Sequence, residues 1–269
     1  MTTSLNPAEV RAFADALLAA ARYQRPVEPL TDTRPDLSVA DAYAIQQAIV
    51  ADRRARGEEL VGWKLGLTSR AMQEQLGVSE PDYGPLLTGH LTDEGTVFAG
   101  DLIAPRVEAE IAFVLARPLR GPGVTPADVL AATGGVAASL EVIDSRVAAW
   151  RIRLADTIAD MASSARIVVS ERVVPVADVS LGEMGVVLRK NGEVVAEGRG
   201  SAVMGDPAAA VAWAANTLGR LGATLEAGHV VMPGAMHASV PAAPGDQFTA
   251  EFDGLGEVTV VFRAGGSKQ

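Results

Sequence analysis

Three glutamates in two short apolar segments are the residues of this chain whose types and spacing could do chemistry. Glu108 and Glu110 lie in residues 106–115, and Glu141 lies in residues 140–146. Alternate residues of a strand point to one face, so Glu108 and Glu110 share a face that continues with apolar side chains. Burying two carboxylates together is costly unless a cation neutralises them. The pattern therefore indicates a site for a hard divalent cation, with a solvated strand end as the alternative.

The composition narrows the kind of cation site and the kind of partner. The chain has 269 residues, 48% of them hydrophobic, which is sufficient for a substantial core. A formal net charge of -10 argues against nucleic acid and anionic membranes as partners. The absence of cysteine excludes disulfides and thiolate catalysis, and only three histidines are present. Carboxylate ligands, and therefore Mg²⁺ or Mn²⁺, are favoured.

No targeting segment is expected. Residues 1–9 have neither a basic start nor an apolar run, so they do not resemble a signal peptide. No apolar stretch reaches membrane-spanning length without charged or turn residues. We expect a cytoplasmic protein.

The pattern of helix and strand signals predicts a mixed α+β chain. Asn6 and Glu9 flank a proline in a typical helix start, and Asn191-Gly192 between apolar runs is a strong hairpin signal. The expected elements are helices over 7–23, 38–56, 155–163 and 206–221, strands over 60–67, 229–232, 247–252 and 257–262, a turn over 81–85, and the hairpin 185–196. We expect a mainly helical N-terminal region, residues 1–100, and a β-rich catalytic domain, residues 101–265, within one structural unit.

Five further residues could take part in chemistry, and each also has a structural interpretation. Lys64, in an apolar strand, is either a snorkelling edge lysine or an acid, base or carboxylate anchor. Asp82 either bonds its own turn or carries a proton. Arg146 either pairs with a carboxylate of the protein or clamps that of a substrate. Ser163 either caps or donates to a ligand, and a loop histidine such as His237 is more often a surface residue.

Several segments, in order along nearly the whole chain, together resemble the 2-keto-4-pentenoate hydratase and 4-oxalocrotonate decarboxylase family, within the fumarylacetoacetate hydrolase superfamily. The segments that carry the resemblance are residues 41–46, 61–69, 80–84, 105–114, 140–146, 158–164, 244–246 and 254–256.

The resemblance implies a fold and a set of roles. The fold is a fumarylacetoacetate-hydrolase-like β-sandwich or roll with the helical N-terminal part packed against it. Glu108, Glu110 and Glu141 would bind one Mg²⁺ or Mn²⁺, Lys64 and Asp82 would be acid/base groups, and Ser163 would lie near the substrate. A homo-oligomer is also implied, and association with a pathway enzyme is a separate expectation.

The implied activity is addition of water to 2-hydroxypenta-2,4-dienoate, or a longer homologue, to give a 4-hydroxy-2-oxo acid in meta-cleavage degradation of aromatic compounds. The alternative is decarboxylation of 4-oxalocrotonate at the same metal site. The loop 233–237 lacks the Thr-Gly-Gly typical of the decarboxylases, which favours the hydratase. Met161 and Pro233 depart from the family pattern, which usually has Asn and Thr there. Met161 is the one feature that favours a third possibility, a catalytically weak accessory subunit.

Overall fold

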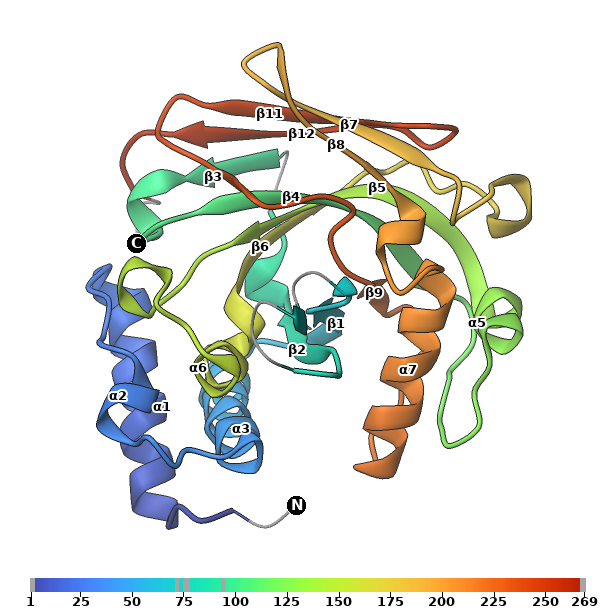
Figure 1. Ribbon diagram of the computed structural model, residues 1–269. Helices are drawn as coiled ribbons and strands as arrows, with labels where there is room; N and C mark the ends of the chain where they lie inside the picture. The colour runs from blue at the N-terminus through green and yellow to red at the C-terminus, as the bar shows by residue number, and fades with distance from the viewer. Residues whose placement is uncertain (1–2, 71–72, 75–77, 93–94, 267–269) are drawn as a thin grey trace.

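Two curled β-sheets stack on one another in the computed structural model, which describes residues 3–70, 73–74, 78–92 and 95–266 (Figure 1). The first sheet contains β1 (Leu60–Gly66), β2 (Asp82–Leu87), β4 (Arg106–Leu115), β5 (Thr133–Ile143), β6 (Ser164–Val169), β9 (Val230–Met232) and β10 (Val240–Pro241). The second contains β3 (Thr96–Phe98), β7 (Gly185–Lys190), β8 (Glu193–Arg199), β11 (Gln247–Phe252) and β12 (Gly256–Arg263). The strand orders are β2-β1-β9-β4-β5-β6, with β10 beside β4, and β3-β12-β11-β7-β8.

The helices flank the first sheet on the side away from the second (Figure 1). They are α1 (Pro7–Tyr23), α2 (Leu30–Thr33), α3 (Val39–Ala55), α5 (Pro126–Ala132), α6 (Leu154–Ala159) and α7 (Pro207–Arg220). The described part of residues 1–100 supplies β1, β2 and β3 as well as α1, α2 and α3, so each sheet combines strands from both parts of the chain. None of the helices within the described ranges is long and apolar enough to cross a membrane.

The main hydrophobic core fills the space between the two sheets. β11 and β12 pack over β5, and the aromatic rings of Phe248 and Phe262 meet edge to face at 5.9 Å within this core. The odd-numbered residues of β4, from Val107 to Leu115, are buried in the same core. The even-numbered residues, which include Glu108 and Glu110, therefore point to the opposite, concave face of the first sheet.

A second core joins α1, α3 and α6, and it supports the edge of the first sheet. Gln46 on α3 donates a hydrogen bond to the carbonyl of Tyr83 on the edge strand β2 and another to the carbonyl of Ile158 on α6, both at 3.0 Å. Tyr43, one helical turn before Gln46, stacks on the Tyr83 ring with centroids 4.4 Å apart. The helices thus fix β2 from the face opposite to Asp82.

Several expected elements are confirmed. The helix over 7–23 has the predicted cap, in which Asn6 and Glu9 satisfy each other's backbone N–H groups. The hairpin of β7 and β8 turns at Asn191 and Gly192, both with positive φ.

Two expectations were wrong. The predicted turn over 81–85 is instead strand β2, which tolerates Pro85 because an edge strand has one unpaired side. The helix expected over 155–163 ends at Ala159, and residues 161–163 turn back with left-handed backbone angles. Buried polar contacts of Asp160, described below, take the chain out of the helix there.

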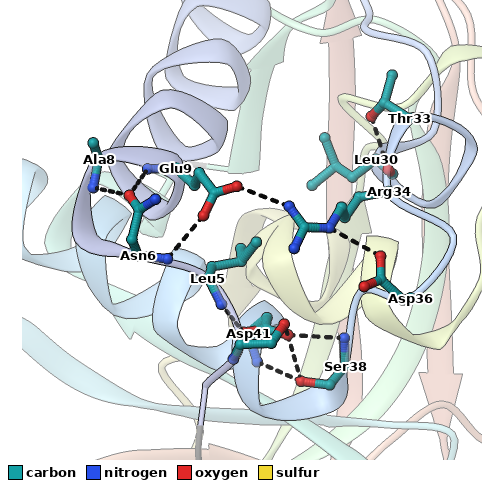
Figure 2. A network of polar contacts seen from close by, with 11 residues as sticks. Leu5, Asn6, Ala8, Glu9, Leu30, Thr33, Arg34, Asp36, Ser38 and Asp41 are labelled. Atoms are coloured by element: carbon teal, nitrogen blue, oxygen red, sulfur yellow. Dashed lines mark hydrogen bonds and ion pairs between the residues drawn. The ribbon is translucent and has the colours of Figure 1, made fainter.

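The N-terminal segment is attached to α3 through one buried carboxylate, Asp41 (Figure 2). Asp41 accepts hydrogen bonds from the backbone of Ser4 and Leu5 and from the backbone and hydroxyl of Ser38. Burial raises the pKa of Asp41, but the hydrogen bonds from Ser38, Leu5 and Ser4 outweigh it and hold the pKa well below its usual value. The ionised group therefore locks the start of the chain to the helix that supports β2.

We expect Asp41→Ala to lower the free energy of unfolding by about 2–4 kcal/mol, because it leaves several buried N–H groups without an acceptor. Urea unfolding followed by circular dichroism measures the loss. Asp36→Ala is the matched control, since the Asp36 side chain is 70% exposed in its ion pair with Arg34 and should contribute less than about 0.5 kcal/mol. Equal losses in the two variants would contradict this account.

Candidate metal centre and active site

Strand pairing brings the three glutamates of the sequence analysis together. β4 and β5 are antiparallel, and Glu108 is the direct partner of Glu141, while Glu110 lies opposite Ser139. One carboxylate oxygen from each glutamate lies within 4.8 Å of the others. Glu110 and Glu141 have no exposed surface, whereas Glu108 is partly exposed. The cluster is therefore buried on the concave face of the first sheet, with Glu108 on its outer side.

Lys64 and Asp82 share the face of β1 and β2 that looks toward this cluster. Lys64 pairs with Gly84 and Gly66 pairs with Asp82, so the two charged side chains lie on the same side. In a flat sheet, β1 and β5 would lie about 14 Å apart, since β9 and β4 separate them. The strong curl of the sheet, visible in Figure 1, brings the Lys64 ammonium to within 3.2 Å of Glu141 Oε2. With 4% exposure, Lys64 does not snorkel to solvent.

Burial and mutual repulsion set the protonation of these groups. Burial raises the pKa of Glu108 to about 7, with Lys64 opposing the shift and Glu141 adding to it. Burial also raises the pKa of Glu110 well above its ordinary value and raises that of Asp82. Burial alone would lower the pKa of Lys64, but the surrounding carboxyls raise it above its usual value. The ammonium is therefore charged, and a cation bound at the cluster would compete with protons for Glu108 and Glu110.

The loop after β9 holds the cluster from the side. The Gly234 N–H donates to Glu110 Oε2 at 2.8 Å. A side chain at Gly234 would place a Cβ 1.9 Å from Thr68 Oγ1, and its φ of 121° also requires glycine. His237 accepts the Ala109 N–H at Nε2, at 3.2 Å, so Nδ1 carries the proton that it donates to the next carbonyl. His237 thus straps the loop to β4 and does not face the carboxylates as a ligand.

Several oxygens of the cluster accept no hydrogen bond from the residues that the structure describes. They are Oε1 of Glu110, Oε1 of Glu141 and Oδ1 of Asp82, all inaccessible to solvent, while Glu141 Oε2 lies in the ion pair with Lys64. A buried acceptor without a donor costs about 1–3 kcal/mol, so an arrangement of this kind needs a further partner. A donor set made only of carboxylate oxygens suits a hard divalent cation. The residues present therefore fit a divalent metal held by Glu108, Glu110 and Glu141.

Arg146 and Ser163, the two expected substrate-binding residues, make contacts within the protein. The Arg146 guanidinium is buried and binds Asp160, with Nε 2.5 Å from Oδ1. The sequence left two roles open for Arg146, and this contact is the first of them, an ion pair with a carboxylate of the protein. The Ser163 hydroxyl lies 3.2 Å from the hydroxyl of Thr157, and its carbonyl accepts the Asp144 N–H. Ser163 follows the residue whose carbonyl contacts Lys64, so it borders the site.

A left-handed turn carries that carbonyl. Met161, Ala162 and Ser163 have φ values of 59°, 50° and 57°, a region in which each L-residue costs roughly 1–2 kcal/mol. Ala162 accepts a hydrogen bond from Lys64 Nζ at 2.9 Å. Asparagine tolerates this backbone conformation better than methionine does, which gives a physical reason for the family pattern at position 161. The Met161 side chain packs in the core of α1, α3 and α6, so the feature that favoured an accessory role lies among core residues.

The sequence reasoning did not single out three groups that border the cluster. Gly234 and Ala162 act through their backbones, and a backbone donor or acceptor leaves no mark in side-chain chemistry. Arg106 could have been found, because it precedes Glu108 by two residues on the same strand face and its charge lowers the pKa of Glu108. Its guanidinium lies over the Trp150 ring, 5.0 Å from the centroid.

Comparison with known proteins places this site in a family. The 2-hydroxyhexa-2,4-dienoate hydratase of Comamonas testosteroni is 43% identical over 91% of this chain and 94% of its own length. The 4-oxalocrotonate decarboxylase of Pseudomonas sp. (strain CF600) is 42% identical over 97% of this chain and all of its own length. A crystal structure of the 4-oxalocrotonate decarboxylase from Pseudomonas putida G7, complexed with magnesium and adipate, superposes with a TM-score of 0.94 at 40% identity, over 97% of this chain and all of that one.

The profile described as fumarylacetoacetate (FAA) hydrolase C-terminal matches residues 86–263, which include β4, β5 and all three glutamates. The fold class expected from the sequence, with N-terminal helices packed on curled sheets, is confirmed by the same comparisons. This chain belongs to the fumarylacetoacetate hydrolase family.

Proposed function

We propose that this protein is a metal-dependent hydro-lyase that adds water to 2-hydroxypenta-2,4-dienoate or a longer homologue, giving a 4-hydroxy-2-oxo acid. The proposal rests on the three clustered glutamates together with a facing lysine and aspartate, an arrangement suited to a 2-oxo acid. The names of the similar hydratase and decarboxylase support this class of substrate. A homo-oligomer acting on a free small molecule is part of the same proposal.

Glu108, Glu110 and Glu141 would hold one Mg²⁺ or Mn²⁺. When bound, the cation would act as a Lewis acid toward the adjacent carboxylate and 2-oxo oxygens of the substrate. Lys64 directs its ammonium to Glu141 and to the Ala162 carbonyl, which leaves a third N–H for a substrate carboxylate or enolate oxygen. Lys64 thus anchors the acid end of the substrate beside the cluster.

Asp82 is the group best suited to move protons. The reaction adds a proton at C5 while the 2-hydroxyl proton is lost, which gives the 2-oxo-3-enoate. Water oxygen then bonds to C4, one water proton passes to a side chain, and a proton is added at C3. A carboxyl exchanging these protons needs a raised pKa and a free oxygen. Asp82 has both: burial raises its pKa, and Oδ1 has no hydrogen-bond partner among the described residues.

The presence of the Asp82 carboxyl also favours hydration over decarboxylation. Decarboxylation of a 2-oxo acid needs an electron sink but no group that takes a proton from water, whereas hydration needs both. The loop 233–237, with Pro233 in place of threonine, supports the same choice.

Magnesium affinity should rise with pH. Because burial raises the pKa of Glu108 to about 7, the ion must displace a proton below that pH, and we expect roughly tenfold weaker binding at pH 6 than at pH 8. Isothermal titration calorimetry at the two pH values measures this. Glu110→Gln is the control, with an intact circular dichroism spectrum and no measurable Mg²⁺ binding at either pH. Wild-type affinity in Glu110→Gln, or equal affinity at both pH values, would refute the assignment of the cluster.

Purified protein with Mg²⁺ should convert freshly prepared 2-hydroxypenta-2,4-dienoate, seen as loss of its ultraviolet absorbance. Lys64→Ala and Asp82→Asn should each lower kcat by about 100-fold or more, because they remove the anchor and the proton carrier. Thermal unfolding of both variants controls for misfolding. Dienoate turnover at the wild-type rate in either folded variant removes that residue from the mechanism. A wild-type protein that binds Mg²⁺ but turns over neither dienoate nor 4-oxalocrotonate would instead indicate an accessory subunit.

The decarboxylase remains a second candidate because of Arg106. A basic group two residues from Glu108 on the same strand face could bind the second carboxylate of 4-oxalocrotonate.

Arg106→Gln discriminates between the two activities. If the protein is a hydratase of a substrate with one carboxylate, the variant should keep kcat/KM for the dienoate within about threefold. If 4-oxalocrotonate is the substrate, carbon dioxide release should show a KM raised by about tenfold or more. Arg117→Gln, on an exposed segment beyond the other end of β4, is the charge-matched control.

A further inference from the structure

The salt bridge between Arg146 and Asp160 lies at the base of the left-handed turn that carries the Ala162 carbonyl. The Arg146 backbone N–H donates to Asp160 Oδ2 at 2.9 Å, Nε lies 2.5 Å from Oδ1, and Nη2 donates to the Asp160 carbonyl at 2.5 Å. Nη1 donates to the Ser164 carbonyl at 3.1 Å. A single guanidinium therefore binds the residue before the turn and the residue after it.

The turn depends on such outside contacts. Its three consecutive residues adopt a conformation that L-residues rarely choose, so external contacts must hold them there. The turn is also pressed against β2: a Cβ on Gly84 would lie 2.6 Å from the Met161 carbonyl oxygen. Only glycine at this position lets the turn approach the strand so closely.

The position of the turn determines what surrounds the Lys64 ammonium. The Ala162 carbonyl accepts from Nζ at 2.9 Å on one side, and Glu141 Oε2 lies 3.2 Å away on the other. Without the carbonyl, the flexible lysine chain would have only carboxylates as partners and would be drawn further into the cluster. The hydrogen bond to the Ala162 carbonyl thus holds the ammonium against the attraction of the carboxylates.

We propose that Arg146 and Asp160 are positioning residues, which hold the left-handed turn so that the Ala162 carbonyl fixes the Lys64 ammonium beside Glu141. Neither residue touches the substrate in this assignment. The effect of this residue pair on the Lys64 ammonium is inferred from the geometry alone, whereas its effect on turnover rests on the proposed function.

Arg146→Lys is the decisive variant. It keeps the positive charge and can still pair with Asp160, but a lysine cannot bind both ends of the turn as the planar guanidinium does. Asp160→Asn is a second variant, which removes the charge but keeps the size. Either variant that folds, judged by circular dichroism, is sufficient for the test.

Lys64 can be observed directly, because the chain has only three lysines, Lys64, Lys190 and Lys268. In protein labelled with ¹⁵N and ¹³C, the wild type should show slowly exchanging Nζ protons for Lys64 and a scalar coupling across its hydrogen bond to the Ala162 carbonyl carbon. We expect both signals to be lost in Arg146→Lys and Asp160→Asn. This measurement needs no substrate, so it stands even if the protein hydrates no dienoate.

Two matched variants separate positioning from general loss of stability. Arg53→Lys alters a comparable two-pronged pair, in which the Arg53 guanidinium binds the Glu58 carboxylate instead of the turn, and it should leave the Lys64 signals unchanged. Ala162→Gly relieves the positive φ, so the double variant Arg146→Lys with Ala162→Gly should recover part of the lost coupling.

In the dienoate assay, Arg146→Lys should lower kcat/KM by about tenfold, because the displaced ammonium no longer anchors the acid end of the substrate. A folded Arg146→Lys protein with an unchanged Lys64 coupling overturns the proposal, and so does equal loss of the coupling in Arg53→Lys. If the coupling is lost in Arg146→Lys but the wild type turns over no dienoate, the proposed function is refuted and the positioning role is retained.

Discussion

The burial of four carboxyl groups around one ammonium is the electrostatic constraint on which the rest of this structure depends. Glu108, Glu110, Glu141 and Asp82 face Lys64 on the concave side of a curled sheet, where water screens them little. Burial raises the pKa of Glu108, Glu110 and Asp82, and burial alone would lower the pKa of Lys64. Together the carboxyls keep the ammonium charged, but one positive charge does not balance four acids. A divalent cation would supply the missing charge, and this charge deficit is the physical ground for the proposed metal site.

Backbone groups hold several of these charged side chains in position. The Gly234 N–H fixes one oxygen of Glu110, and the Ala162 carbonyl fixes the ammonium. Both backbone groups lie on segments with positive φ, and both segments are pressed against neighbours that permit no larger residue, at Gly234 itself and at Gly84. Side chains outside the cluster keep these segments in place: His237 holds the loop after β9, and Arg146 with Asp160 holds the turn. Strain near the site is thereby balanced by contacts outside it.

The sequence was sufficient for the local part of this arrangement. The period of two in β4 placed Glu108 and Glu110 on one face, and the caps and the Asn191-Gly192 turn predicted α1 and the β7–β8 hairpin. It was insufficient wherever sheet curvature or buried polar contacts decide the outcome. The approach of Lys64 to Glu141 depends on a curl spread over four strands, which no short pattern encodes. The helix expected up to Ser163 ended early because the contacts of Arg146 with Asp160 outweigh local propensity, and β2 was missed because an edge strand admits proline.

The partly exposed position of Glu108 has a consequence for the order in which ligands enter. Glu110 and Glu141 lie beneath it without contact with solvent, so an incoming molecule meets Glu108 first. An organic anion that approaches before a cation is bound would be repelled by the Glu108 carboxylate, whereas a cation would be attracted to the cluster. A bound divalent cation would reverse the sign of the local electrostatic potential, which would then favour binding of the anion. Binding should therefore be ordered, with the cation bound before the organic acid.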